Sequence, residues 1–304
     1  MLAPWLELPG LADRLGSYSD VVGQDLAAHG TTSDAATIRD TAVAQPLLVA
    51  TALLTCSAVL AGDLAGVDAV AGHSVGEFGA AAIAGVLTET QALSLVTVRG
   101  AAMARAAATT PTGMSAVLGG DPAEVLAWLA ELGLTPANVN STGQVVAAGT
   151  LQALAALTAN PPARTRVIPL DVAGAFHTTH MAPAVAELAA GAAMVEPADP
   201  RITLLSNADG TAVTTGAQAL ARLVAQVANP VRWDLCQRTM LHLGVTGVLE
   251  LAPAGVLSGL ARRTLPGVET VAVKSPADLD AARELVRRHG GTAPRTPDTQ
   301  EIPS

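Results

Sequence analysis

Apolar and polar positions between residues 67 and 108 alternate in a way that predicts a strand, a tight turn and two helices. Residues 67–71, VDAVA, form a short apolar run that stops at Gly72, which is typical of a buried central strand. Residues 75–88 are rich in glycine and alanine and predict a helix that packs closely on a sheet. Residues 89–108 predict a second helix, which Pro111 and Gly113 end.

The most continuous apolar run is residues 46–61, PLLVATALLTCSAVLA. As a helix it is about 24 Å long, shorter than the roughly 30 Å hydrocarbon core of a membrane. We therefore expect a buried helix, with Pro46 in its first turn and with Gly62 and Asp63 ending it.

The pattern changes after Pro111, where short runs alternate. Residues 114–119, 138–148 and 166–172 predict strands, the middle range holding two strands around STG, and residues 122–132 and 151–157 predict helices. The order βαββαβ indicates a ferredoxin-like unit. We predict a small subdomain at 113–172 inserted into a large α/β subdomain at 1–112 and 173–289, with further strands at 201–207 and 244–252. Residues 290–304 lack periodicity and predict a disordered tail.

Composition narrows the classes of protein and partner. Hydrophobic residues make up 50% of the chain and aromatic residues only 2%, so the interior is built from small aliphatic side chains. A formal net charge of −9 without a basic stripe argues against nucleic-acid binding. Cys56 and Cys236 lie among apolar neighbours without metal-ligand or redox spacing. No export signal or membrane span is predicted, so we expect a cytoplasmic protein.

GHSVG, residues 72–76, is a candidate nucleophile elbow around Ser74. Such a turn between a strand and a helix brings backbone segments so close that we expect neither Gly72 nor Gly76 to have room for a Cβ atom. The pattern alone is weak, but the predicted strand before it and the helix after it supply the required context.

A serine nucleophile needs a base, and the chain has six histidines. Three of them fall in helix-like or terminal contexts and are interpreted as surface residues: His29, His242 and His289. His73 is expected to brace the elbow. His177 and His180, in GAFHTTHM, lie where the chain leaves the small subdomain, and their spacing does not decide between them.

Arg99 lies in an otherwise small and apolar helix, LVTVRGAAMA. A buried guanidinium is kept with an anion. That anion is either a carboxylate of the protein, the commoner case, or the carboxylate of a substrate.

Six short runs together resemble the malonyl-CoA:acyl carrier protein transacylases of bacterial fatty-acid synthesis and the related acyltransferase domains of polyketide synthases. They occur in the family's order between residues 5 and 285: QPLL (45–48), AGHSVGE (71–77), RGAAM (99–103), GAFH (174–177), QVANPVRW (226–233) and LAPAGVLSGL (251–260). The resemblance implies an α/β-hydrolase-like large subdomain with the ferredoxin-like insertion.

The resemblance also implies a role for each candidate residue in the transfer of malonyl from malonyl-CoA to acyl carrier protein. Ser74 takes up the malonyl group, and His177 is its base, oriented by the main-chain carbonyl of Gln226; Asp171 is structural. Arg99 grips the malonyl carboxylate. Completing the site are the N–H of Val75 in the oxyanion hole, Met103 in the substrate pocket, and Phe176, whose bulk crowds an α-methyl group. No metal or organic cofactor is implied.

One departure from the family keeps other readings open. The family begins with a strand and a GQGxQ loop that gives a second N–H to the oxyanion hole, and the sequence from Met1 contains neither. Losing such a donor typically costs about 10² to 10³ in rate. The alternatives are a serine esterase or thioesterase that uses the same elbow, and an impaired remnant that still binds the carrier protein.

Overall fold

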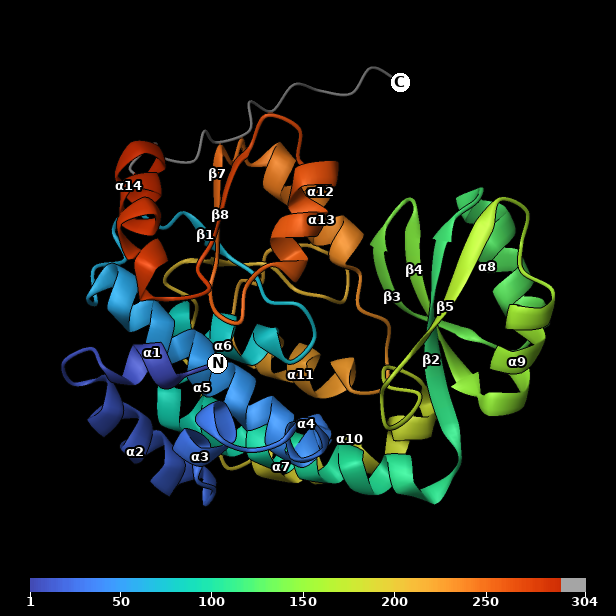
Figure 1. Ribbon diagram of the computed structural model, residues 1–304, viewed down its shortest axis with the longest axis horizontal. Coiled ribbons are helices and arrows are strands. Elements are labelled where there is room, and N and C mark those ends of the chain that lie inside the picture. Colours follow the sequence, from blue (N-terminus) through green and yellow to red (C-terminus); the bar gives the residue numbers. More distant parts are fainter. Residues whose placement is uncertain (291–304) are drawn as a thin grey trace.

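The computed structural model describes residues 1–290, and helices joined by short turns make up the first 60 residues (Figure 1). They are α1 (Ala3–Leu6), α2 (Leu11–Val22), α3 (Leu26–Thr31), α4 (Ala35–Arg39) and α5 (Thr41–Leu60). The side chains of Asp25, Asp34 and Asp40 accept backbone hydrogen bonds at the starts of α3, α4 and α5. Such caps satisfy N–H groups that have no partner inside a helix.

The prediction that Pro46 lies in the first turn of the long apolar helix was wrong, because α5 begins five residues earlier, at Thr41. Proline has no N–H for the carbonyl four residues before it. That carbonyl, on Ala42, accepts a hydrogen bond from Gln24 Nε2 at 3.1 Å instead. Among residues 1–290, α5 alone is long and apolar enough to cross a membrane, but a core helix passes the same test, and 61% of its most apolar stretch is buried inside the protein.

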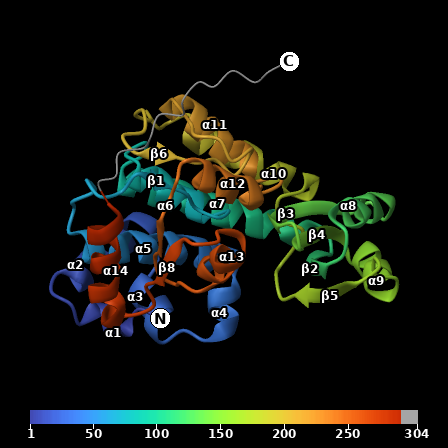
Figure 2. The ribbon, with the colours of Figure 1, turned by 90° about the horizontal axis from the view of Figure 1, so that it is seen from above.

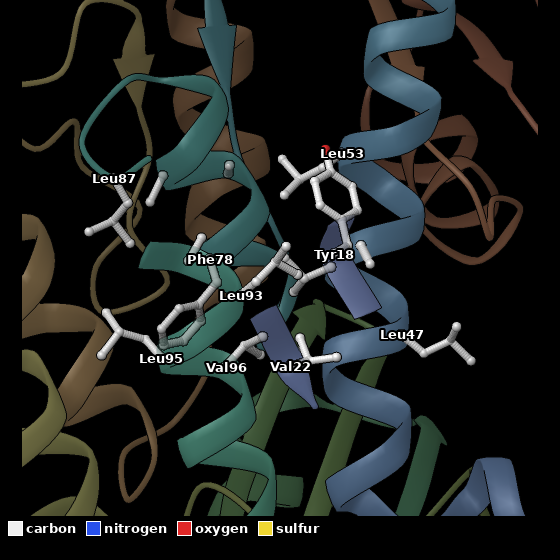
Figure 3. Close-up of a cluster of buried hydrophobic side chains, with 14 of the residues drawn as sticks. Tyr18, Val22, Leu47, Leu53, Phe78, Leu87, Leu93, Leu95 and Val96 are labelled. Atoms are coloured by element: carbon white, nitrogen blue, oxygen red, sulfur yellow. The ribbon is translucent and has the colours of Figure 1, made fainter. Parts of the chain in front are cut away.

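The strand, turn and helices predicted between residues 67 and 108 are present. Strand β1 (Ala69–Val70) is shorter than predicted, and α6 (Gly76–Ile83) and α7 (Glu89–Thr109) follow it. Thr88 and Gln91 form a capping box at the start of α7. Figure 3 shows Phe78 of α6 beside Leu95 of α7, and Val96 of α7 beside Val22 of α2, in one core that also includes Leu53 of α5.

The predicted ferredoxin-like unit is confirmed. Its elements are β2 (Thr112–Gly119), α8 (Pro122–Glu131), β3 (Thr135–Ser141), β4 (Gln144–Thr150), α9 (Leu151–Ala159) and β5 (Thr165–Leu170), with antiparallel strand order β3-β4-β2-β5. Figures 1 and 2 show α8 and α9 on the face of this sheet that points away from the rest of the molecule. The exact subdomain boundaries stay a prediction.

The two faces of this sheet serve different cores because side chains alternate along each strand. Val145 and Ala147 of β4 pack under α8 and α9. Val146 and Ala148 of the same strand point the other way and pack with Ala175, on the segment that returns to the large subdomain. The inner face of the small subdomain therefore packs against the segment around Ala175, which leads back into the large subdomain.

The rest of the chain completes the large subdomain. It comprises η1 (Thr179–Met181), α10 (Ala182–Ala192), β6 (Thr203–Leu204), α11 (Gly216–Gln226), α12 (Trp233–His242), β7 (Gly247–Glu250), α13 (Val256–Thr264), β8 (Glu269–Ala272), η2 (Pro276–Asp278) and α14 (Leu279–His289). β6 pairs in parallel with β1, and β7 with β8. Both strands predicted at 201–207 and 244–252 exist but are shorter. The predicted tail lies, beyond Gly290, outside the described residues.

Candidate active site

Ser74 lies on a strained turn between β1 and α6. Its φ of 53° is in the left-handed region, which is uncommon for a serine. A Cβ added to Gly72 would lie 2.0 Å from the backbone carbon of Gly76, so only glycine fits at position 72. The prediction for Gly76 was wrong, because a Cβ there would meet nothing within 4 Å. The close approach is one-sided: residue 72 passes against the backbone at the start of α6.

His177 is the histidine that reaches this serine. Its Nε2 lies 2.7 Å from Ser74 Oγ, and its Nδ1 lies 2.8 Å from the main-chain oxygen of Gln226. A carbonyl oxygen only accepts, so Nδ1 carries the hydrogen and Nε2 is free to accept the serine proton. His180 lies in η1, where its backbone N–H donates to Thr178 Oγ1. The structure thus resolves the choice that spacing left open.

The backbone around His177 is held tightly. His177 has a φ of 61°, so both members of the Ser74–His177 pair have left-handed backbones. The backbone N–H of Ala175 donates to Thr112 Oγ1 at 3.0 Å, and Thr178 Oγ1 donates to the carbonyl of Ala175. Such strain persists only where surrounding contacts fix it, and it concentrates at functional sites.

Burial keeps the His177 imidazole neutral. The side chain is almost fully enclosed, and burial together with the nearby positive charge of Arg99 lowers its pKa to about 3. A neutral imidazole with Nδ1 anchored is a base ready to accept a proton at Nε2. A hydroxyl in contact with such a base is the arrangement found in serine nucleophiles.

Arg99 is 1% exposed and is held by amide oxygens. Its Nη1 donates to Gln45 Oε1 at 2.5 Å and its Nη2 to Gln226 Oε1 at 2.9 Å. Nη2 also lies 3.4 Å from Ser74 Oγ. Arg99 takes part in none of the ion pairs found among residues 1–290, so the first of the two alternatives, a direct carboxylate partner from the protein, is not found there. Burial lowers its pKa to about 10, against the opposing effect of Glu77.

The remaining predicted residues surround this centre. Met103 is buried, and its Sδ accepts a hydrogen bond from Gln45 Nε2 at 3.5 Å. The same Gln45 side chain accepts a hydrogen bond from the Arg99 guanidinium. Phe176 precedes the histidine and is partly buried between the large core and the inner face of the small subdomain. Val75 follows the serine as the N-cap of α6, and its N–H has no hydrogen-bond partner within residues 1–290.

Three residues of the site were missed by the sequence reasoning: Gln45, Glu77 and Asn207. Asn207 Oδ1 accepts from the Ser74 N–H at 2.7 Å, and its Nδ2 donates to the Gly72 carbonyl at 2.8 Å. Gln45 and Glu77 lie in the quoted runs QPLL and AGHSVGE, and Asn207 ends the predicted strand RITLLSN. A polar residue at the carboxyl end of a buried strand was the available signal for Asn207.

Glu77 is a buried carboxyl group at the start of α6. Its Oε1 accepts from the Asn207 N–H at 3.1 Å and its Oε2 from Gln226 Nε2 at 2.5 Å. Burial raises the pKa of Glu77 to about 7, and these hydrogen bonds and Arg99 oppose the rise. The group therefore titrates close to neutral pH.

Two other predicted roles can be placed. His73 Nε2 lies 2.9 Å from Asn140 Oδ1 on β3, and its ring packs edge-on against Trp233, so it braces the elbow against the small subdomain. Asp171 is exposed and pairs with Arg39 at 2.9 Å, away from His177.

The described part of the chain holds neither a group of metal ligands nor an accessible cysteine. No group of three or more His, Cys, Asp or Glu side chains there could hold a metal ion. Cys56 and Cys236 are buried, and burial raises the pKa of both thiols.

Known proteins match this chain over most of its length. The family described as "Acyl transferase domain" matches residues 18–286. The malonyl CoA-acyl carrier protein transacylase of Mycobacterium tuberculosis is 55% identical over 287 residues, covering 94% of this chain and 95% of that protein. The crystal structure of MCAT from Mycobacterium tuberculosis superposes with a TM-score of 0.90 over 93% of this chain and 94% of that one, again at 55% identity.

A second solved structure adds a partner to the comparison. It is a malonyl-transacylase in complex with a type II PKS acyl-carrier protein, and it is 31% identical to this chain with a TM-score of 0.87, covering 93% of this chain and 94% of that one. The sequence identity, the family match and the fold agree. The chain therefore belongs to the malonyl CoA-acyl carrier protein transacylase family of acyl transferases.

Proposed function

We propose that this chain transfers the malonyl group of malonyl-CoA to the phosphopantetheine thiol of acyl carrier protein, through an ester on Ser74. The observation that carries the proposal is the meeting of three groups at one point: Ser74 Oγ lies 2.7 Å from His177 Nε2 and 3.4 Å from Arg99 Nη2. The names of the relatives, and the carrier protein bound to one of them, support the same reaction.

The first half of the reaction forms the ester. As Ser74 Oγ attacks the thioester carbonyl, His177 Nε2 takes the hydroxyl proton and the Gln226 carbonyl stabilises the imidazolium through Nδ1. The proposed donor to the oxyanion of the tetrahedral intermediate is the N–H of Val75, at the positive end of α6. The C–S bond then breaks, and the coenzyme A thiolate receives the proton from His177.

The second half reverses these steps with a new thiol. His177 takes the proton of the carrier phosphopantetheine thiol, whose sulfur attacks the ester; collapse of the intermediate returns the proton to Ser74 Oγ and releases malonyl-carrier protein. All chemistry is proton and acyl transfer, so we propose that no metal or organic cofactor takes part. A cytoplasmic location and carriers of fatty-acid or polyketide synthesis fit this substrate pair.

Arg99 supplies the preference for a carboxylate-tipped acyl group. Without an ionised partner from the protein, its charge is open to the malonyl carboxylate close to the nucleophile. An acetyl group would leave the guanidinium without an ionised partner, as it is in the free protein, so only a malonyl group gains this charge-assisted contact. We propose that Phe176, the residue before His177, crowds an α-methyl group.

Intact-protein mass spectrometry tests the proposal. Incubation with malonyl-CoA adds the mass of one malonyl group to the wild-type protein and none to Ser74→Ala. Addition of holo acyl carrier protein then discharges the adduct and produces malonyl-carrier protein. Discharge at the same rate in buffer alone, with no carrier product, would identify a hydrolase, and the absence of any adduct would identify a binding remnant.

A further inference from the structure

One side chain separates the guanidinium of Arg99 from the buried carboxyl group of Glu77. The amide of Gln226 faces both: its Oε1 accepts from Arg99 Nη2 at 2.9 Å, and its Nε2 donates to Glu77 Oε2 at 2.5 Å. All three side chains are at most 5% exposed. A carboxylate and a guanidinium enclosed this closely would ordinarily form a direct pair.

We propose that the Gln226 amide is a polar spacer that keeps Glu77 off Arg99, and that Glu77 is the positioning residue that fixes this amide. The inference deepens, and rests on, the proposed malonyl transfer. It concerns which acyl group the site prefers, so Gln226 acts through its side chain here, separately from its main-chain bond to His177.

The spacer resolves a conflict between stability and selectivity. A lone buried cation is costly, and the negative charge of Glu77 offsets part of that cost without touching Arg99. A direct ion pair would offset more, but it would occupy the donors that a malonyl carboxylate needs. With an amide between the two groups, the guanidinium stays oriented and keeps its charge for the substrate.

The amide has one orientation that fits its surroundings. Besides Glu77, Nε2 also reaches the Ser74 carbonyl at 3.1 Å and Asn207 Oδ1 at 3.2 Å, so three acceptors face the nitrogen and one donor faces the oxygen. A reversed amide would place NH₂ against the guanidinium. Asn207 is itself fixed, because its N–H donates to Glu77 Oε1. Glu77 therefore holds both the amide and the asparagine that supports the elbow.

Protonation of Glu77 would weaken this hold, because a neutral carboxylic acid accepts hydrogen bonds less strongly than a carboxylate. Within residues 1–290, the charged or titratable groups that interact electrostatically with it are Arg99 from α7 and Cys236 from α12, and His177 contacts the main chain of Gln226, whose amide binds Glu77. Burial keeps the thiol and the imidazole neutral through the neutral pH range. Glu77 is then the group whose charge changes there.

The first test compares acyl groups rather than overall rates. Gln226→Glu places a carboxylate directly on Arg99 while the main-chain carbonyl at position 226 remains. We expect the ratio of malonyl-CoA to acetyl-CoA loading, kcat/KM against kcat/KM, to fall at least about tenfold, mainly through a raised KM for malonyl-CoA. An equal loss for both substrates would indicate a merely structural role and would overturn the proposal.

The second test uses Glu77→Gln, with Glu89→Gln as the control that removes a carboxylate from the same large subdomain. In the wild type we expect malonyl loading to rise with pH through the Glu77 pKa of about 7. Glu77→Gln loses that rise, and Glu89→Gln keeps it. A rise that persists in Glu77→Gln, or a wild type without one, contradicts the positioning role.

Binding without chemistry separates this inference from the proposed function. In a Ser74→Ala background, calorimetry measures affinity for malonyl-CoA and acetyl-CoA with and without Gln226→Glu. The spacer predicts a malonyl preference that Gln226→Glu removes, even if the wild type forms no adduct. Adduct formation without any such preference would leave the transfer reaction standing and refute the spacer.

Discussion

Arg14, which binds the first residue of α7, and Arg99, which lies within α7, differ in their exposure and in the charge of their partners. Arg14 of α2 donates to both carboxylate oxygens of Glu89, the first residue of α7, at 2.6 and 2.8 Å, and its Nε donates to the Tyr18 hydroxyl at 2.7 Å. Its side chain is 39% exposed. Arg99, ten residues further along α7, is 1% exposed, and within residues 1–290 its guanidinium donates hydrogen bonds only to two amide oxygens and a hydroxyl, with the Phe78 ring beside it.

The difference separates a charge used for packing from a charge held for a ligand. Arg14 is neutralised by a carboxylate and partly solvated, so its cost of burial is small. Arg99 is desolvated without a direct countercharge, an arrangement that lowers stability and is worth keeping only where an anion arrives later. What distinguishes Arg99 from Arg14 is burial without a direct carboxylate partner.

Truncation of each arginine gives the largest contrast. Arg99→Ala should lower kcat/KM for malonyl loading by about 10² to 10³, because a buried charge-assisted contact to the substrate carboxylate is lost. Arg14→Ala should change it less than about twofold. Quenched-flow loading followed by mass spectrometry checks both, and comparable losses in the two variants would refute the distinction.

Lysine substitution separates the effect of the positive charge from that of the planar guanidinium. Lysine keeps the charge but loses the planar fork that serves Gln45, Gln226 and the substrate together. We expect Arg99→Lys to retain a preference for malonyl-CoA over acetyl-CoA while loading about 10- to 100-fold more slowly. Arg14→Lys should load at the wild-type rate. Full activity in Arg99→Lys would mean that charge alone suffices.

The sequence pattern correctly predicted elements whose limits depend on nearby residues, and it misplaced limits that depend on distant ones. The helix α7 was predicted from the pattern of residues 89–108 and from Pro111 and Gly113 after its end, and the structure has it at Glu89–Thr109. The start of α5 was misplaced because the carbonyl that Pro46 leaves free is satisfied by Gln24, a partner from another helix. The strand at 201–207 was too long because an apolar run does not reveal that β1 offers only two residues for pairing.

The same division applies to the site. Ser74, His177 and Arg99 stand in runs with recognisable chemistry, and the structure brings all three together. The roles of Glu77 and Asn207 became visible only in three dimensions, since they depend on contacts between side chains of α6, α11 and the segment after β6. The lack of a direct carboxylate partner for Arg99 is likewise a property of the fold, because no spacing in the chain shows that the Gln226 amide lies between Arg99 and Glu77.

A change in the titration of His177 is the next smaller effect. The positive charge of Arg99 contributes to the lowered pKa of this imidazole, so Arg99→Gln should raise that pKa toward 6.5, with burial still holding it below. Arg14→Gln should leave it unchanged. NMR titration of the histidine side chains measures both variants, and an identical His177 pKa in Arg99→Gln would mean that burial alone sets it.

The same shift links to stability. The folded pKa of about 3 lies below the unfolded value of about 6.5, so the unfolded chain binds this proton first as pH falls. With respect to this group, the unfolding free energy is therefore at its full value above pH 6.5, and it decreases as the pH falls toward 3. Urea unfolding of Arg99→Gln should show a shallower decline over this window than the wild type.

The smallest expected effect is the one that tests the packing role of Arg14. Glu89→Gln removes the countercharge of a partly solvated pair and weakens an acidic first turn of α7, so the unfolding free energy should fall by about 0.5 to 1 kcal/mol. The loss should shrink in high salt, because exposed charges are screened. Malonyl loading and the malonyl-to-acetyl ratio should both stay at wild-type values. If Glu89→Gln altered that ratio, α7 would be transmitting the state of its first turn to Arg99, and the two arginines would form one coupled unit instead of two independent ones.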